Sequence, residues 1–216
     1  MPLITPEQIV TPFITGDWED RTVDPEIQFT FRLAASDEIF IYAGIIPSVR
    51  RESVYFTPSL GAQNAATSSL VAVFRGSPAS AGANLSSTGF GLEDVLRRSG
   101  VAMATFERWR ITSPEQSDTV AETIYQDVVK YGLPEFSQVR TLADLIERLQ
   151  GEHRHQMQTG HLAVACGLAG QRAQAEAALR EFAEAAQTQQ GAMLEQTRGF
   201  VSRFVEHFGY GAEYVK

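Results

Sequence analysis

Three of the four histidines and the only cysteine of the chain lie in one stretch, GEHRHQMQTGHLAVAC, at residues 151–166. Histidine nitrogens and cysteine thiolates are common zinc ligands, so His153, His155 and His161 are the candidate metal ligands. On a helix, paired ligands recur four residues apart, whereas His153 and His155 are two apart and would face different sides. The spacing therefore favours a polar connection into a buried helix, with Cys166 as a small core residue and no cofactor.

A second candidate site is the acidic segment GDWED at residues 16–20, where Asp17 and Glu19 flank Trp18. Paired carboxylates carry out glycosidic chemistry and, beside an aromatic ring, could also hold a sugar or a metal. The alternative is a turn in which Trp18 packs on the core while the acids stay in solvent. We favour this alternative because charged side chains are mostly exposed, and we keep the three residues as the candidate ligand-binding set.

The sequence contains no Gly-x-Ser-x-Gly nucleophile motif and no Walker A motif. Cys166 stands among alanine, valine and glycine, and burial in such an apolar helix would raise the pKa of its thiol and make it unreactive. No catalytic residue can therefore be named from a motif.

The composition is that of a folded acidic protein, with 44% hydrophobic residues and a formal net charge of −8 over 216 residues. Nucleic-acid binding normally requires a basic surface, so the acidic composition argues against a nucleic-acid-binding protein. One cysteine cannot form an internal disulfide, the first residues do not resemble a signal peptide, and no apolar run approaches the roughly 20 residues of a membrane span. The expected location is the cytoplasm, away from membranes.

Strand patterns dominate the first half of the chain. Alternating or continuous apolar runs predict strands at 27–33, 39–43, 53–57, 69–75 and 101–111. The stretch 76–92 is rich in glycine, serine and alanine, a composition that favours partial disorder over an ordered lid.

Helical patterns and capping residues fill the second half, predicting helices at 117–131, 142–149, 155–169, 173–187 and 193–208. Strands followed by helices indicate an α+β fold, with an N-terminal antiparallel β-sheet followed by a C-terminal helical part. We expect residues 1–112 to be mainly β and 113–216 mainly α, as one compact domain or two tightly packed subdomains.

Two segments resemble known protein families. Residues 162–182 resemble a single tetratricopeptide-type helical hairpin; the matching small and large residues are Leu162, Ala165, Cys166, Gly170, Ala175 and Leu179. The layout over 100–150, with Trp109, Gly132 and Pro134, is similar to uncharacterised bacterial α+β proteins, several of which belong to immunity-type families. The first resemblance implies close helix packing, and the second implies binding of a partner protein.

These observations predict a non-enzymatic, cytoplasmic, protein-binding protein of immunity-like type. An acidic surface could neutralise a basic partner by electrostatic complementarity. Two alternatives stay open: a small-molecule or metal-dependent enzyme with a site between sheet and helices, and a homodimeric structural protein that pairs through the long C-terminal helix.

Overall fold

The structure is a computed structural model that describes residues 11–13, 15–20, 29–50, 53–101, 105–151, 155–185 and 190–211. Its internal contacts divide the chain into two units. The sheet unit takes the described residues of 1–35, 40–62 and 89–138, and the helical unit takes those of 36–39, 63–88 and 139–216. Each unit is described separately.

The predicted α+β fold is confirmed, and its sheet has the strand order β1-β2-β3-β4-β5, with β6 paired to β4. The described strands are β1 (Glu19–Asp20), β2 (Phe29–Ala34), β3 (Ile39–Arg50), β4 (Ser53–Asn64), β5 (Thr88–Gly91) and β6 (Arg110–Ile111). The pairs β1–β2, β2–β3 and β4–β6 are antiparallel, and Phe31 lies opposite Ala43 in the β2–β3 register. The strands predicted at 39–43 and 53–57 are therefore found and are 12 residues long each, and the one predicted at 27–33 is found from Phe29, since 27–28 lie outside the described residues.

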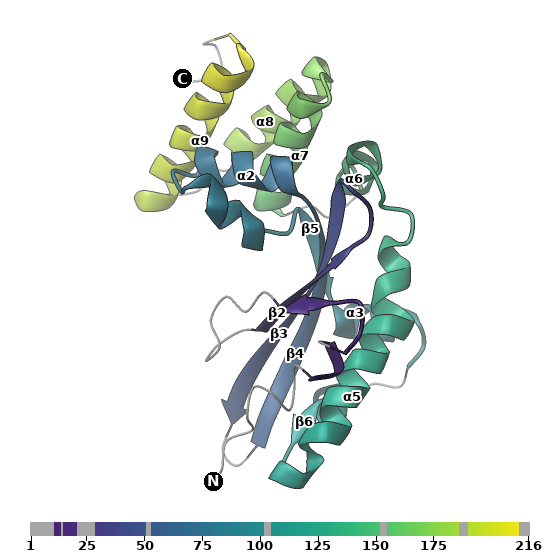
Figure 1. The fold of residues 1–216 in the computed structure, drawn as a ribbon. Coiled ribbons are helices and arrows are strands. Elements are labelled where there is room, and N and C mark those ends of the chain that lie inside the picture. Colours follow the sequence, from purple (N-terminus) through teal and green to yellow (C-terminus); the bar gives the residue numbers. More distant parts are fainter. Residues whose placement is uncertain are drawn as a thin grey trace. The chain divides into compact units, whose positions relative to one another are not determined.

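Helix α5 (Ser117–Asp127) lies along one face of the sheet (Figure 1). It continues through a π turn, η3 (Val128–Gly132), and a 3₁₀ turn, η4 (Leu133–Phe136). An added Cβ at Gly132 would meet Leu60 of β4 at 2.8 Å, so the absence of a side chain lets the helix approach the sheet closely. The core under α5 is aromatic: Phe13 stacks on Phe31 at 4.2 Å between ring centroids and meets Tyr125 edge-on at 5.4 Å.

The strand predicted over 101–111 is wrong except at its end. Residues 105–108 form a helical turn, α4 (Thr105–Arg108), only Arg110–Ile111 form a strand, and 102–104 lie outside the described residues. Another short helix, α3 (Leu92–Arg98), buries Leu92, Val95 and Leu96. The apolar spacing of 101–111 fitted a strand because short apolar runs do not discriminate between helix and strand.

The strand predicted at 69–75 is also wrong, because residues 69–74 belong to helix α2 (Ala65–Phe74) of the helical unit and Arg75 is its C-cap. The Asn64 side chain accepts a hydrogen bond from the Thr67 backbone at 3.0 Å, which is a standard helix N-cap. Residues 76–92, for which the composition favours partial disorder, instead hold the 3₁₀ helix η1 (Ala79–Asn84) and β5. Gly82 lies so close to the Ser68 backbone on α2 that an added Cβ would approach its carbonyl oxygen to 2.5 Å.

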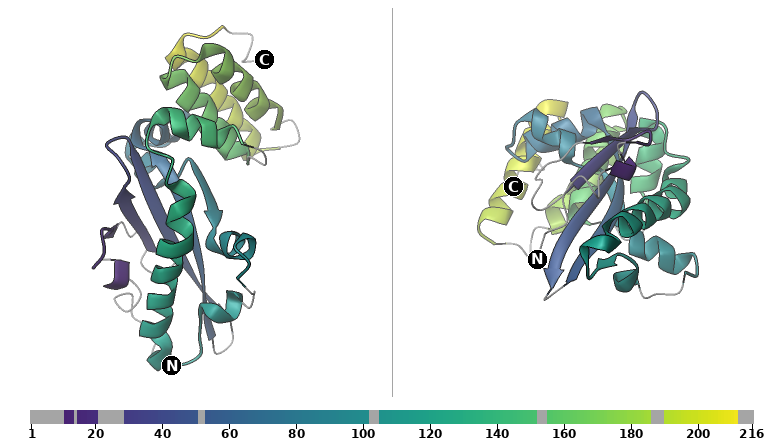
Figure 2. Two further views of the ribbon diagram at one scale, coloured as in Figure 1. Left: turned by 90° about the vertical axis from the view of Figure 1, so that its right-hand side faces the viewer. Right: turned by 60° about the horizontal axis from the view of Figure 1, so that its bottom comes forward.

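The remaining helices occur where the sequence predicts them. They are α6 (Leu142–Leu149), α7 (Gln156–Leu168), α8 (Arg172–Glu184) and α9 (Ala192–Phe208). Helices α7 and α8 form a hairpin whose turn includes Gly170 at φ 70°, and α9 lies beside them (Figure 2). Phe200 of α9 contacts Phe74 at 5.5 Å and Phe182 at 4.6 Å between centroids, so α2, α8 and α9 share one aromatic core.

The two units do not follow the order of the chain, and the expected split into a mainly β part, 1–112, and a mainly α part, 113–216, stays a prediction. Helix α5 belongs to the sheet unit because it buries its apolar side, with Val120 and Ile124, while α2 belongs to the helical unit because Phe74 enters the Phe182–Phe200 core. Strand and helix patterns predict element types in order, but these long-range contacts decide which elements pack together.

Candidate functional site

Helix α5 is fixed to the sheet unit by the carboxylate of Asp127, whose side chain is 2% exposed. Asp127 accepts hydrogen bonds from Arg108 Nε at 2.6 Å and Nη2 at 2.7 Å, and from Trp109 Nε1 at 2.9 Å. These bonds join the end of α5 to the segment just before β6, and they raise the pKa of Arg108, chiefly through the hydrogen bond to Asp127. A buried carboxylate with a cation and an indole N–H as partners is a satisfied structural site.

The exposed side of α5 carries three carboxylates, Glu115, Asp118 and Glu122, which we call the α5 acidic face. Glu115 stands in the 3₁₀ turn η2 (Pro114–Gln116) that leads into α5. The spacings of three and four residues place the carboxylates on one side of the helix. No lysine or arginine occurs between Arg110 and Lys130, and none of the three carboxylates forms an ion pair within the part of the chain that the structure describes.

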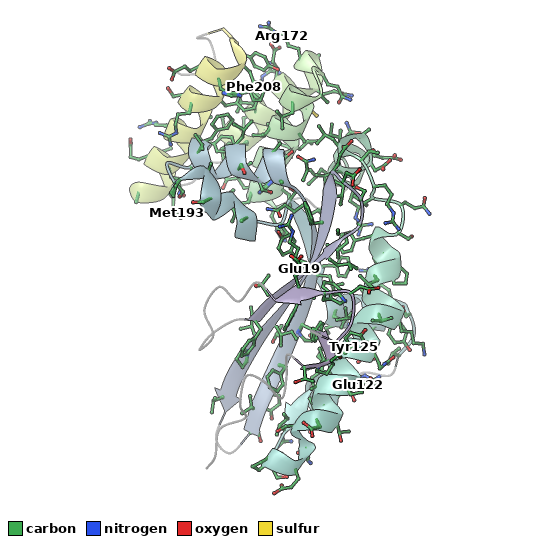
Figure 3. All side chains as sticks on the ribbon, viewed as in Figure 1. Glu19, Glu122, Tyr125, Arg172, Met193 and Phe208 are labelled. Carbon is green, nitrogen blue, oxygen red and sulfur yellow. The ribbon has the colours of Figure 1, made fainter. Side chains whose placement is uncertain are left out.

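Two carboxylates of this face accept hydrogen bonds from uncharged side chains. Glu122 accepts a hydrogen bond from the Gln126 amide at 2.7 Å. A hydrogen bond from the Ser113 side chain is the main cause that lowers the pKa of Glu115, which therefore stays ionised at neutral pH. Figure 3 marks Glu122 one turn before Tyr125 on α5. The face is thus a row of exposed carboxylates on a helix that is anchored at its far end.

The N-terminal segment brings one of the predicted ligand residues toward the same helix. Gly16 lies against the Tyr125 hydroxyl, where an added Cβ would come within 2.6 Å, and the next residue, Asp17, is exposed. Trp18 is 6% exposed and contacts Phe13 edge-on at 6.0 Å, so its ring belongs to the aromatic core. Glu19 lies opposite Arg32 in the β1–β2 register. A ligand site at these three residues stays a prediction, with the indole ring turned inward.

The predicted histidine ligands are only partly described. His153 lies outside the described residues; His155 is exposed at the start of α7, and its backbone N–H donates to Gln158 at 2.9 Å. His161 is 3% exposed in the middle of α7. No three His, Cys, Asp or Glu side chains in the described ranges are grouped so that they could hold a metal. The three-histidine site therefore stays untested, and His155 and His161 lie in different environments.

Cys166 is fully buried on α7, as expected for a packing residue. Burial raises the pKa of its thiol to about 11, so the reactive thiolate is scarce at neutral pH.

A cavity of about 160 Å³ within the helical unit is not predicted by any motif in the sequence. Four apolar side chains line it, Met157, Phe182, Met193 and Phe200, together with Arg75, Gln156, Gln196 and Thr197. These residues come from the end of α2, the start of α7, α8 and α9, so no single motif contains them. The signal that could have pointed here is an arginine directly after the apolar run of α2.

His161 lies close enough to this arginine to be affected by its charge. Burial, and then the positive charge of Arg75, lower the pKa of His161 to about 3, so its ring is neutral. Neither His161 Nδ1 nor Arg75 Nε has a hydrogen-bond partner among the described residues, although both atoms are buried. Unpartnered buried polar atoms are rare in folded proteins and call for an explanation.

The comparisons with known proteins return no relative. No family model, no curated protein and no solved structure matches this chain. Among the described residues, no helix has the length and apolar character needed to cross a membrane.

Proposed function

We propose that this protein acts by binding a partner protein with a basic surface, which docks on the α5 acidic face, and that it does so without catalysis. The observation that carries the proposal is the row of three exposed carboxylates that form no ion pair in the described part of the chain. Complementary charge on a partner would steer its approach and fix its orientation.

The spacing of these acids adds an energetic argument. Like charges three or four residues apart on a helix destabilise it by about 0.2–0.5 kcal/mol per pair. Asp118 stands at such a distance from both Glu115 and Glu122, so these carboxylates repel one another, while the helix N-terminus favours the two acids in the first turn, Glu115 and Asp118. Lysine or arginine side chains of a partner would relieve this repulsion.

The anchoring of α5 supports the same proposal. Asp127 and the aromatic contacts of Tyr125 fix the helix before a partner arrives. A surface that is already ordered loses little conformational entropy on binding, so a larger part of the interaction energy appears as affinity. An immunity-type role, in which the partner is a basic toxin such as a nuclease, is the specific form that the layout of residues 100–150 implies.

Affinity capture from the host with charge-matched variants tests this proposal. One variant neutralises the α5 acidic face through Glu115→Gln, Asp118→Asn and Glu122→Gln. The control variant neutralises three exposed acids of the helical unit through Glu147→Gln, Glu184→Gln and Glu206→Gln, and has the same formal charge.

We expect the wild type and the control to retain the same basic protein at about one copy per chain. The α5 variant should bind it about tenfold more weakly, because each exposed ion pair contributes about 0.2–1 kcal/mol. Binding should also weaken as salt is added. Equal retention by the two variants, or no stoichiometric basic protein with the wild type, would contradict the proposal.

A further inference from the structure

The cavity beside Arg75 has the size and lining of a small-molecule site. A protein cavity of about 150 Å³ can enclose a benzene molecule, and this one is about 160 Å³. Two phenylalanines, Phe182 and Phe200, and two methionines, Met157 and Met193, supply an apolar wall. Methionine and aromatic side chains pack well against a flat ring.

The guanidinium of Arg75 places a positive charge beside this apolar wall, and no carboxylate in the described residues pairs with it. No hydrogen bond or ion pair joins its side chain to another residue in the described ranges, and its Nε is buried without a partner. The acids that stand next to the lining residues in the chain are engaged elsewhere: Glu181 accepts from Thr159 at 3.3 Å, and Glu195 pairs with Arg198 at 3.1 Å. A buried or half-buried arginine without a counter-ion is costly unless an anion joins it.

The end of helix α2 does not use this charge either. Its last carbonyl, that of Phe74, accepts hydrogen bonds from Nε and Nη2 of Arg203 at 2.9 and 2.6 Å. Arg203 therefore satisfies the helix C-terminus, where a cation is favourable. The guanidinium of Arg75 is left to line the cavity together with the amide of Gln196.

We propose that this cavity binds a small aromatic carboxylate, with the ring between Phe182, Phe200 and the methionines and the carboxylate on Arg75. The planar guanidinium fits a carboxylate with two parallel hydrogen bonds, which a single ammonium group would not provide. The site is independent of the α5 acidic face, and its success or failure leaves the proposed protein partner untouched.

Titration with sodium benzoate, followed by NMR or calorimetry, tests the site, with benzyl alcohol as a neutral analogue of similar size. We expect saturable benzoate binding to the wild type and a loss of at least about tenfold in Arg75→Gln, because a hydrogen bond to a charged group is removed. Benzyl alcohol should bind more weakly than benzoate and equally to both proteins. The α5 variant should bind benzoate like the wild type.

A second pair of variants covers the case in which Arg75→Gln does not fold. Met193 lines the cavity and is 61% exposed, so its replacement should not disturb the core (Figure 3). Met193→Glu adds a negative charge at the cavity and should weaken benzoate binding about tenfold more than Met193→Gln, which has a similar length and loses only the methionine contact with the ring. Absence of saturable binding to the wild type, or equal binding by the two Met193 variants, would overturn the proposal.

Discussion

Replacing Asp127 should destabilise the sheet unit by an amount that depends on which hydrogen bonds remain. Asp127→Ala removes the acceptor for Trp109 Nε1, which lies 2.9 Å away on a side chain that is 3% exposed. An unsatisfied buried donor costs about 1–3 kcal/mol. The Arg108 side chain is 40% exposed and can return to water, so its lost ion pair adds only about 1 kcal/mol. The expected loss is about 3 kcal/mol.

Asp127→Asn separates the two contributions. Its amide oxygen can still accept from Trp109, and only the charged interaction with Arg108 is lost, so we expect a loss of about 1 kcal/mol. Asp118→Ala, an exposed change on the same helix, is the matched control and should stay within about 0.5 kcal/mol of the wild type.

Tryptophan fluorescence during urea unfolding is the appropriate assay, because both tryptophans, Trp18 and Trp109, belong to the sheet unit. Circular dichroism at 222 nm, to which the helical unit contributes strongly, should move less. A stability of Asp127→Ala within about 1 kcal/mol of the wild type, or equal destabilisation of the alanine and asparagine variants, would contradict a buried hydrogen bond from Trp109 to Asp127.

Three further predictions concern the helical unit. Gly82→Ala should lower the stability of this unit by about 2 kcal/mol or more in denaturant titrations, because the new Cβ meets the Ser68 backbone. Gly170→Ala should cost about 1 kcal/mol, because its surroundings are open and only the positive φ is unfavourable. Equal effects of the two changes would show that 79–84 does not pack on α2. As the pH falls from 6 to 4, the free energy of unfolding of the wild type should fall by about 1.4 kcal/mol per pH unit more than that of His161→Gln. The unfolded histidine takes up a proton near pH 6.5, whereas the pKa of the folded one is about 3 and its ring stays neutral. Parallel pH profiles would exclude a buried neutral ring. Cys166 should not react with a thiol reagent at pH 8 in the native protein, and rapid labelling without denaturant would place the thiol at the surface.

Sequence patterns predict this fold best where a pattern is long. The helices at 142–149, 155–169 and 193–208 have caps and apolar stripes over at least two turns, and the structure places each within a residue or two. The run at 69–75 is too short to distinguish a strand from a helix, and the Asn64 cap that decides it stands five residues earlier. The small residues of 76–92 resemble a disordered segment, yet Gly82 allows the close contact with α2 that orders them.

The candidate sites depend even more on contacts that a sequence does not show. A cysteine among small apolar residues predicts burial, and Cys166 is buried. The Arg75 cavity collects side chains from four helices, so only the packing of α2, α7, α8 and α9 brings them together. The acids of 115–122 are visible in the sequence, but which side of α5 is exposed follows from the aromatic contacts of Tyr125 beneath it.

The most direct test of the central claim is a photo-cross-link from the α5 acidic face. Cys166 is buried and unreactive, so a cysteine introduced by Thr119→Cys, an exposed position between Asp118 and Glu122, can be labelled selectively with a benzophenone maleimide. Gln174→Cys, an exposed position on α8, is the control. In host lysate, we expect one basic protein to be cross-linked from position 119, with the product lost at high salt, and no such product from position 174. The same products from both positions, or an acidic partner at position 119, would contradict the claim.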